Sequence, residues 1–397
     1  MFFSLGLILL GGFLIGWIFE KIKIPKIVGM ILIGILLGTS VLNIIDDKIL
    51  SISSELRMIA LVVILTRSGL SLNLKKMKKL GRPAILMCFL PATFEIVGVL
   101  IFGPILLGIS HIEALLLGAV LGAVSPAIVV PRMIKLKEER YGNESGVPEI
   151  IMAGASADDI YVIVLFYAFL GLNQTGDINV LSFIQIPSSI ILGVLLGIGV
   201  GFGLGFLFKN ISMPTIVKVL ILLSTSFLMI YLEVVAKEYV SISALLGIMT
   251  IGIVVSLKNK YAAKEIEESY NKIWVFFEII LFVLVGVSVD IKYALDAGFM
   301  PLLLLAIALA FRVVGVFISL LFTKLNFKEK LFCVFSYLPK ATVQASIGGI
   351  ALSFGLPSGR LILTVSILAI LITAPLGAIL MDKTYKKLLR KNVIQYN

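Results

Sequence analysis

The feature that most limits how this chain can fold is a succession of long apolar runs from one end to the other. A run must be long enough to cross about 30 Å of hydrocarbon, and by that measure about thirteen qualify. Because only 14% of the 397 residues are charged, the sequence predicts an all-α polytopic membrane protein. The runs are 3–19, 27–45, 56–71, 83–108, 113–133, 149–171, 183–208, 215–235, 241–257, 272–289, 294–322, 329–354 and 358–381.

The basic residues predict the orientation in the bilayer. Most of the 34 lysines and arginines follow odd-numbered runs or lie in the C-terminal tail. The positive-inside rule therefore places the N-terminus outside and the tail in the cytoplasm. The net charge of +11 is spread over short loops, which argues against a nucleic-acid partner. The first run lacks a basic leader and a cleavage site, so we expect a retained span and a bacterial inner membrane.

Cysteine and histidine offer no metal or redox chemistry. Cys88 and Cys333 lie inside apolar runs, and His111, the one histidine, lies in a short loop. They form no ligand or disulfide pattern, so we expect no cofactor.

Two segments repeat at a spacing of 217 residues. Residues 69–75 (GLSLNLK) align with 286–292 (GVSVDIK), and 95–101 (EIVGVLI) align with 312–318 (RVVGVFI) in the same register. The shift covers seven spans, an odd number, so matched helices cross in opposite directions. The sequence predicts two inverted six-helix repeats joined by a linker helix, as in many secondary transporters, although channels also carry such repeats.

Matching runs in the two halves are interrupted. Pro126 and Pro131 fall inside the fifth run, and Pro339 falls inside the twelfth, followed by the polar residues Thr342 and Gln344. Proline removes a backbone donor, and polar side chains satisfy the groups that a break exposes. An ordinary proline kink is the alternative, but the matched positions favour two broken helices that cross at the bilayer midplane.

Ionisable residues inside these runs are candidate functional groups, because burying a charge in a membrane is costly. Glu95 and Arg312 are repeat equivalents, so a twofold axis in the membrane plane would bring them together. We predict a structural ion pair, with a transported-proton site as the alternative.

Asp158 and Asp159 have no equivalents in the second half, where the register gives Pro375 and Leu376. Adjacent helical residues point about 100° apart. One aspartate should therefore face an ion cavity and the other the broken helices or a basic partner. Burial and mutual repulsion both favour the protonated form, so a small cation and a proton would compete for these carboxylates. Two hydrogen-bonded structural acids are the alternative.

Two further residues belong to the predicted site. Ser125 precedes Pro126 and is a candidate oxygen ligand of the cation. Lys340 follows Pro339 and could neutralise the C-terminal end of a half-helix, or pair with Asp158 or with Asp290. The sequence leaves these partners open.

These residues together resemble the monovalent cation:proton antiporter superfamily. The matching segments are Ser125–Pro126, Ala157–Asp159, Arg312 and 338–344 (LPKATVQ), and the likeness extends over essentially the whole chain. The sequence resembles paired-aspartate sodium/proton antiporters, and most of all the bacterial relatives of the animal NHA-type branch.

The resemblance implies a homodimer, elevator-like alternating access, and exchange of Na⁺ or Li⁺ for H⁺. It implies Na⁺ binding at Asp159, the principal carboxylate, with Asp158 beside it. It divides the chain into a scaffold and dimerisation domain (1–82 and 215–293), a transporting core (83–171 and 294–381), a linker helix (183–208) and a short cytoplasmic tail (382–397).

One departure from the family leaves the stoichiometry open. Electrogenic paired-aspartate antiporters carry a lysine where this chain has Arg312, and an arginine does not give up its proton.

Other functions remain as alternatives at this stage. The nearest is a K⁺/H⁺ antiporter or K⁺-efflux system on the same scaffold. A gated channel is another, and an intramembrane aspartyl protease is more remote. That protease chemistry needs two aspartates on separate helices, whereas Asp158 and Asp159 are contiguous.

Overall fold

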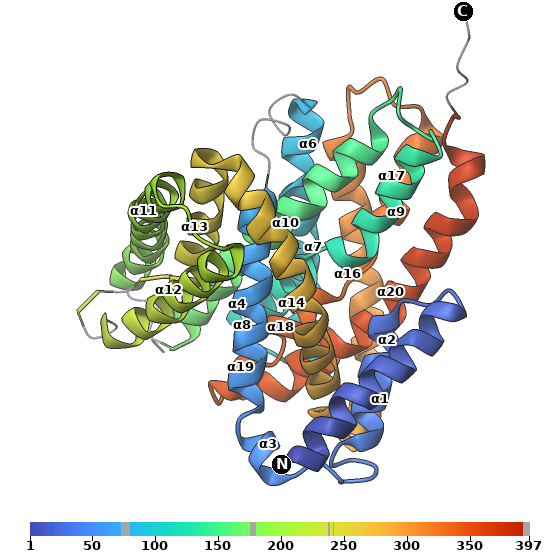
Figure 1. The fold of residues 1–397 in the computed structure, drawn as a ribbon. Coiled ribbons are helices and arrows are strands. Elements are labelled where there is room, and N and C mark those ends of the chain that lie inside the picture. The colour runs from blue at the N-terminus through green and yellow to red at the C-terminus, as the bar shows by residue number, and fades with distance from the viewer. Residues whose placement is uncertain (73–79, 175–179, 237–238, 241, 392–397) are drawn as a thin grey trace, which may run out of the picture. The chain divides into compact units, whose positions relative to one another are not determined.

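The computed structural model describes residues 1–72, 80–174, 180–236, 239–240 and 242–391. Within those ranges nearly all ordered structure is helical, and the one extended pairing is an antiparallel bridge between Tyr141 and Lys391. The end of the first repeat motif, 73–75, and the end of the tail, 392–397, lie outside the described residues. The described helices are α1 (Phe2–Lys21), α2 (Lys26–Leu37), α3 (Asp47–Ser51), α4 (Ser53–Ser71), α6 (Arg82–Met87), α7 (Leu90–Leu107), α8 (His111–Gly122), α9 (Pro126–Glu138), α10 (Val147–Gln174), α11 (Val180–Asn210), α12 (Thr215–Ala236), α13 (Ala244–Lys258), α14 (Lys260–Val287), α15 (Ile291–Asp296), α16 (Met300–Ser319), α17 (Phe327–Ser336), α18 (Thr342–Ile347), α19 (Ile350–Ser353) and α20 (Gly359–Leu388) (Figure 1).

The helices agree with a protein that crosses a membrane many times. In the described part of the chain, nine helical segments are long and apolar enough to span a bilayer, and α2 and α13 are shorter apolar helices. Every one of the thirteen predicted runs contains at least one helix, and the twelfth contains three, α17, α18 and α19. The number of crossings stays a prediction, because length and composition alone do not place a helix in the membrane.

The chain forms two compact units. The first comprises Met1–Ser51, Asn73–Phe166 and Phe282–Asn397, and the second comprises Ile52–Leu72 and Tyr167–Leu281. All the predicted site residues belong to the first unit. The predicted scaffold and core have different limits; that division concerns which parts move during transport, and it stays a prediction.

Small residues allow a matching pair of close helix contacts, one in each unit. In the second unit, a Cβ atom on Gly69 of α4 would meet the Met249 carbonyl of α13. In the first unit, a Cβ atom on Gly286 of α14 would meet the Ile31 carbonyl of α2. The spacing of 217 residues relates α4 to α14 and α2 to α13, so the two contacts join equivalent helices. This arrangement follows the register of the predicted repeat.

A stripe of glycines along one face of α11 packs against α13, beside which α11 runs in Figure 1; the stripe consists of Gly193, Gly197, Gly201 and Gly205. A Cβ atom on Gly193 would clash with the Ser243 carbonyl, and one on Gly197 would clash with the Gly247 carbonyl. The stripe therefore serves close packing inside the second unit.

Helix α20 holds both interrupted helices of the first unit. At its beginning, the Ser358 amide donates to Glu113 of α8 at 3.3 Å. Farther along, Thr373 Oγ1 accepts from the Lys340 amide at 3.0 Å, inside the break between α17 and α18. The long, uninterrupted α20 is thus a support against which the irregular backbone of the site is fixed.

Candidate ion-binding site

The first interruption separates α8 from α9. Helix α8 ends at Gly122, Ala123–Ser125 are extended, and α9 begins at Pro126. Proline suits the first turn of a helix because the amide it lacks has no intrahelical partner there. Pro131, which we had also assigned to the break, lies inside α9 without ending it. The interruption therefore lies directly before Pro126, and Pro131 is not part of it.

The second interruption separates α17 from α18. Helix α17 ends at Ser336, and α18 begins at Thr342, with Pro339 in the irregular segment between them. The two interruptions touch, because the Ser125 amide donates to the Pro339 carbonyl at 2.8 Å. The predicted breaks are thus present in the structure and in direct contact.

Gln344 satisfies carbonyls that the first break leaves exposed. Its Nε2 donates to the carbonyls of Val120 and Ala123, each at 3.0 Å, and to that of Leu121 at 3.3 Å. Such freed carbonyls have no intrahelical donor, so a buried side chain takes that role. Gln344, in α18, therefore stabilises the end of α8.

A buried arginine joins two of the predicted acids. Arg312 Nη1 lies 2.7 Å from Glu95 Oε2, and Nη2 lies 3.1 Å from Asp158 Oδ2. None of the three side chains is more than 1% exposed. The structure therefore places Glu95 and Arg312 together, as the repeat register predicts, and adds Asp158 as a second partner.

Arg312 and Asp158 also fix the irregular backbone. Arg312 Nε donates to the Tyr337 carbonyl at 2.6 Å, and Nη1 donates to the Gly122 carbonyl. Asp158 Oδ2 accepts from the Val124 amide at 2.8 Å. One guanidinium thus contacts both interrupted helices, a geometry for which its planar fork of donors is suited.

Lys340 is fully buried, and its partner is Glu95. Its Nζ lies 2.7 Å from Glu95 Oε1 and donates to Glu95 Oε2 at 2.9 Å and to the Leu121 carbonyl. Leu121 belongs to the last turn of α8, so Lys340 binds the C-terminal end of a half-helix, which was one of the partners predicted for it. The pairing with Glu95 was not anticipated.

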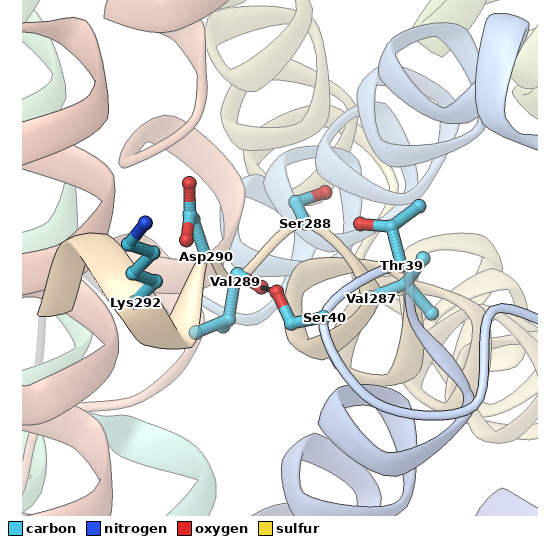
Figure 2. Close-up of a pocket in the computed structure, with 7 residues that line it drawn as sticks. All are labelled: Thr39, Ser40, Val287, Ser288, Val289, Asp290 and Lys292. Carbon is cyan, nitrogen blue, oxygen red and sulfur yellow. Dashed lines mark hydrogen bonds between the residues drawn. The ribbon is translucent and has the colours of Figure 1, made fainter. Parts of the chain in front are cut away.

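Asp290, the other suggested partner of Lys340, lies elsewhere. It lines a pocket of about 380 Å³ with Lys292 and with Ser40, which follows α2 (Figure 2). Its Oδ1 accepts from the Tyr293 amide at 3.0 Å and caps α15. This pocket contains none of the predicted ion-site residues.

Asp159 differs from its neighbour in having no counter-charge. It is 4% exposed, and its Oδ1 is buried without a hydrogen-bond donor. In the described part of the chain, no cation lies within ion-pairing distance of it, whereas Asp158 pairs with Arg312. A buried carboxylate of this kind is stable as the neutral acid or with a bound cation.

Several oxygen atoms around the two breaks are also unpartnered. The carboxylates contribute Asp158 Oδ1 and Asp159 Oδ1, and the neutral side chains contribute Ser125 Oγ, Thr342 Oγ1 and Gln344 Oε1. All are buried oxygens, the ligand type that hard cations prefer. These five atoms belong to residues singled out from the sequence, and each is an oxygen that could bind an alkali cation.

The formal charges of the cluster suit exchange of one monovalent ion for another. With Glu95 and Asp158 ionised, their charges balance those of Arg312 and Lys340. Asp159 then adds one negative charge when ionised, which one proton or one alkali cation neutralises. The site can therefore hold either ion without leaving a net buried charge.

Some structural contributors carried no recognisable signal in the sequence. A Cβ atom on Gly154 would clash with the hydroxyl of Tyr337, and one on Gly377 would clash with the ring of Pro339. The hydroxyl of Thr373 accepts a hydrogen bond from the backbone amide of Lys340. Glycine and threonine are common in membrane helices, so only the three-dimensional contacts distinguish these positions.

Comparison with known proteins identifies the family of the chain. The model of the transmembrane sodium/hydrogen exchanger family matches residues 7–382. The chain is 34% identical over 384 residues to sodium/hydrogen exchanger 9B2 of Mus musculus, across 93% of this chain and 69% of that protein. It is 30% identical over 415 residues to sodium/hydrogen exchanger 9B1 of Homo sapiens, across 98% and 78%.

A solved structure has the same fold. The sodium proton antiporter MjNhaP1 from Methanocaldococcus jannaschii at pH 8 superimposes with a TM-score of 0.83 over 97% of both chains. The sequence identity is 21%, so this likeness concerns the fold. From the family match and the identity to curated relatives, the chain belongs to the sodium/hydrogen exchanger family.

Proposed function

We propose that this protein is a secondary antiporter that exchanges Na⁺ or Li⁺ for H⁺ by alternating access. The observation that carries the proposal is the buried, uncompensated carboxylate of Asp159 beside the balanced charges of Glu95, Asp158, Arg312 and Lys340. The family consists of ion exchangers rather than enzymes, which removes the protease alternative.

Asp159 is the carrier in this proposal. An arriving cation binds the ionised carboxylate and excludes the proton, and a proton bound there excludes the cation. Competition for one carboxylate is sufficient for exchange, provided that the empty, ionised site does not change its access from one side of the membrane to the other. That condition follows from the cost of moving an unpaired charge through a medium of low dielectric constant.

The neighbouring residues have distinct roles. Asp158 offers Oδ1 to the cation while its Oδ2 remains bound to Arg312 and the Val124 amide. Ser125, Thr342 and Gln344 supply neutral oxygens, which bind a cation without adding charge. Glu95, Arg312 and Lys340 form the fixed ionic framework that holds the two interrupted helices together.

The protein is a multi-pass membrane protein, and the proposal also covers its location, its orientation and its oligomeric state. We infer a cell membrane as its location, with the N-terminus outside and the tail inside, from the distribution of lysine and arginine. We also infer a homodimer, from the resemblance to antiporters of this type.

The test is ion exchange in everted membrane vesicles that hold a pH gradient. Addition of Na⁺ or Li⁺ should collapse the gradient with the wild-type protein, and Asp159→Asn should abolish the response. Asp290→Asn is a matched control, because it removes an acid outside the site, and it should exchange normally. Full-rate exchange by Asp159→Asn would contradict the carrier role. A response to K⁺ alone would favour the K⁺/H⁺ alternative.

A further inference from the structure

The half-helix α9 carries the candidate ligand Ser125 at its N-terminal end, where the chain is unwound. Its 13 residues extend over about 20 Å, so a tilt of about 10° about one end moves the other by about 3 Å. That displacement exceeds the tolerance of a metal–oxygen contact. The far end of α9 must therefore be held in place if Ser125 is to remain at the ion site.

A set of contacts joins this far end to the end of α20. Within α9, Arg132 forms a two-pronged ion pair with Asp382, with Nε to Oδ1 and Nη2 to Oδ2 both at 3.1 Å. Arg132 Nη1 also donates to the Ile128 carbonyl at 3.0 Å, which fixes the guanidinium against its own helix. Paired parallel hydrogen bonds define orientation better than a single contact does.

One turn farther along α20, aromatic and polar contacts continue the connection. Tyr385 Oη donates to Glu139 at 2.8 Å, directly after the last residue of α9. The ring of Tyr385 packs edge-on against that of Tyr141, with centroids 5.0 Å apart. Exposed ion pairs alone stabilise little, so this half-buried aromatic contact adds to what the Arg132 pair provides.

The segment after α20 completes the connection through its backbone. Leu389 is 4% exposed, the Gly142 amide donates to the Arg390 carbonyl at 2.9 Å, and Tyr141 forms an antiparallel bridge with Lys391. Asp382, Tyr385 and Leu389 are spaced three and four residues apart and so share one face of the helix. We name this set the α9–α20 clamp; it comprises Arg132, Glu139, Tyr141 and Gly142 on one side and Asp382, Tyr385, Leu389, Arg390 and Lys391 on the other.

We propose that the α9–α20 clamp makes α9 and α20 move as one body during transport and thereby positions Ser125 for the cation. Arg132, Asp382 and Tyr385 are positioning residues, since none of them touches the ion. α20 also holds Lys340 through Thr373, so the clamp relates Ser125 to the second interruption as well. This inference rests on the proposed exchange function and assigns it a determinant of cation affinity outside the ion site.

The first test separates affinity from rate. Asp382→Ala and Tyr385→Ala should each raise the KM for Na⁺ about five-fold, the effect of one weakened polar contact, and change the maximal rate less than two-fold. Lys383→Ala, on the exposed surface beside Asp382, is the control and should leave both constants unchanged. The exchanged pair Arg132→Asp with Asp382→Arg should recover most of the affinity.

Tyr385→Phe is a milder variant in case the alanine substitutions reduce the amount of folded protein. It keeps the aromatic contact and removes only the hydrogen bond to Glu139, so a smaller rise in KM is expected. An unchanged KM in all three variants, with folded protein present, would overturn the proposal.

The second test locks the clamp. Tyr141 and Lys391 lie opposite each other in the antiparallel bridge, where Cα atoms are about 4.5–5.5 Å apart, a separation that permits a disulfide. The double variant Tyr141→Cys with Lys391→Cys, oxidised, should exchange Na⁺ at half or more of its reduced rate. Loss of exchange on oxidation, restored by reductant, would show that the clamp must open and would overturn the proposal.

The controls distinguish failure of the proposed exchange function from failure of the proposed clamp. Absence of exchange in both the wild type and Lys383→Ala would refute the proposed function itself. Exchange in the wild type together with an unaltered KM in the clamp variants would refute only the clamp.

Discussion

Lys340 Nζ lies 2.7 Å from Glu95 Oε1, although 245 residues separate them in the sequence. Glu95 also binds Arg312, so one buried carboxylate serves two buried cations. Because Arg312 in turn binds Asp158, these four residues form a closed set of balanced charges. The negative charge that remains belongs to Asp159, and for that reason we propose Asp159 as the exchangeable residue.

Removing Glu95 should destabilise the protein through the cations left behind. Glu95→Gln leaves Lys340 and Arg312 with a single anion between them, and breaking a buried pair in this way costs about 3–5 kcal/mol. We expect a lower melting temperature in detergent, and recovery of part of the loss in the double variant Glu95→Gln with Lys340→Met. Additive losses in the two single variants and the double variant would argue against direct coupling.

The two adjacent aspartates should respond oppositely when neutralised. Asp158→Asn removes the charge that Arg312 binds and should cost about 2 kcal/mol, the value of a hydrogen bond to a charged group. Asp159→Asn removes a buried carboxylate without a counter-charge, so stability should be unchanged or higher. Thermal unfolding of both variants in the absence of Na⁺ measures this difference. A larger loss for Asp159→Asn would contradict the assignment of Asp159 as the uncompensated acid.

The contact between Gly377 and Pro339 should be intolerant of a side chain. A methyl group on Gly377 would meet the proline ring at the second interruption, and overpacking of this kind costs about 1–3 kcal/mol. Gly377→Ala should therefore lower the melting temperature and weaken Na⁺ binding. Gly199→Ala is the matched control, because a Cβ atom there would meet nothing and alanine favours the helix. Equal melting temperatures for the two variants would show that the ring adjusts without cost.

The sequence predicted the contact between Glu95 and Arg312, because the internal repeat pattern, with its spacing of 217 residues, relates the two positions. Pro126 and Pro339 marked the two interruptions because each lies inside one of the two runs that this spacing matches. The special status of Asp158 and Asp159 also followed from their lack of repeat equivalents.

The partners of Lys340 could not be obtained from the sequence. Its choice among Glu95, Asp158, Asp290 and a half-helix end depends on side-chain directions in an irregular segment, which no periodic pattern describes. The same holds for Gly154 and Gly377, whose role is to leave room for Tyr337 and Pro339. Such contacts depend on how distant helices pack, and small apolar residues at the right spacing occur throughout this chain.

The dependence of Na⁺ affinity on pH should report how many protons compete with the cation. A protonated Asp159 cannot bind Na⁺, so lowering the pH through the titration range of this carboxylate removes binding sites. Each fall of one pH unit should then raise the apparent KM for Na⁺ by up to ten-fold, while the maximal rate at saturating Na⁺ stays constant.

The slope of log KM against pH measures the number of competing protons directly. If Asp158 stays ionised in its pair with Arg312, one proton competes and the slope should approach −1. A slope near −2 would mean that Asp158 also takes up a proton, and exchange of two protons for one Na⁺ would then move charge across the membrane. Repeating the measurement with an imposed membrane potential distinguishes the cases: a one-for-one exchange should not respond to the potential, and a two-for-one exchange should.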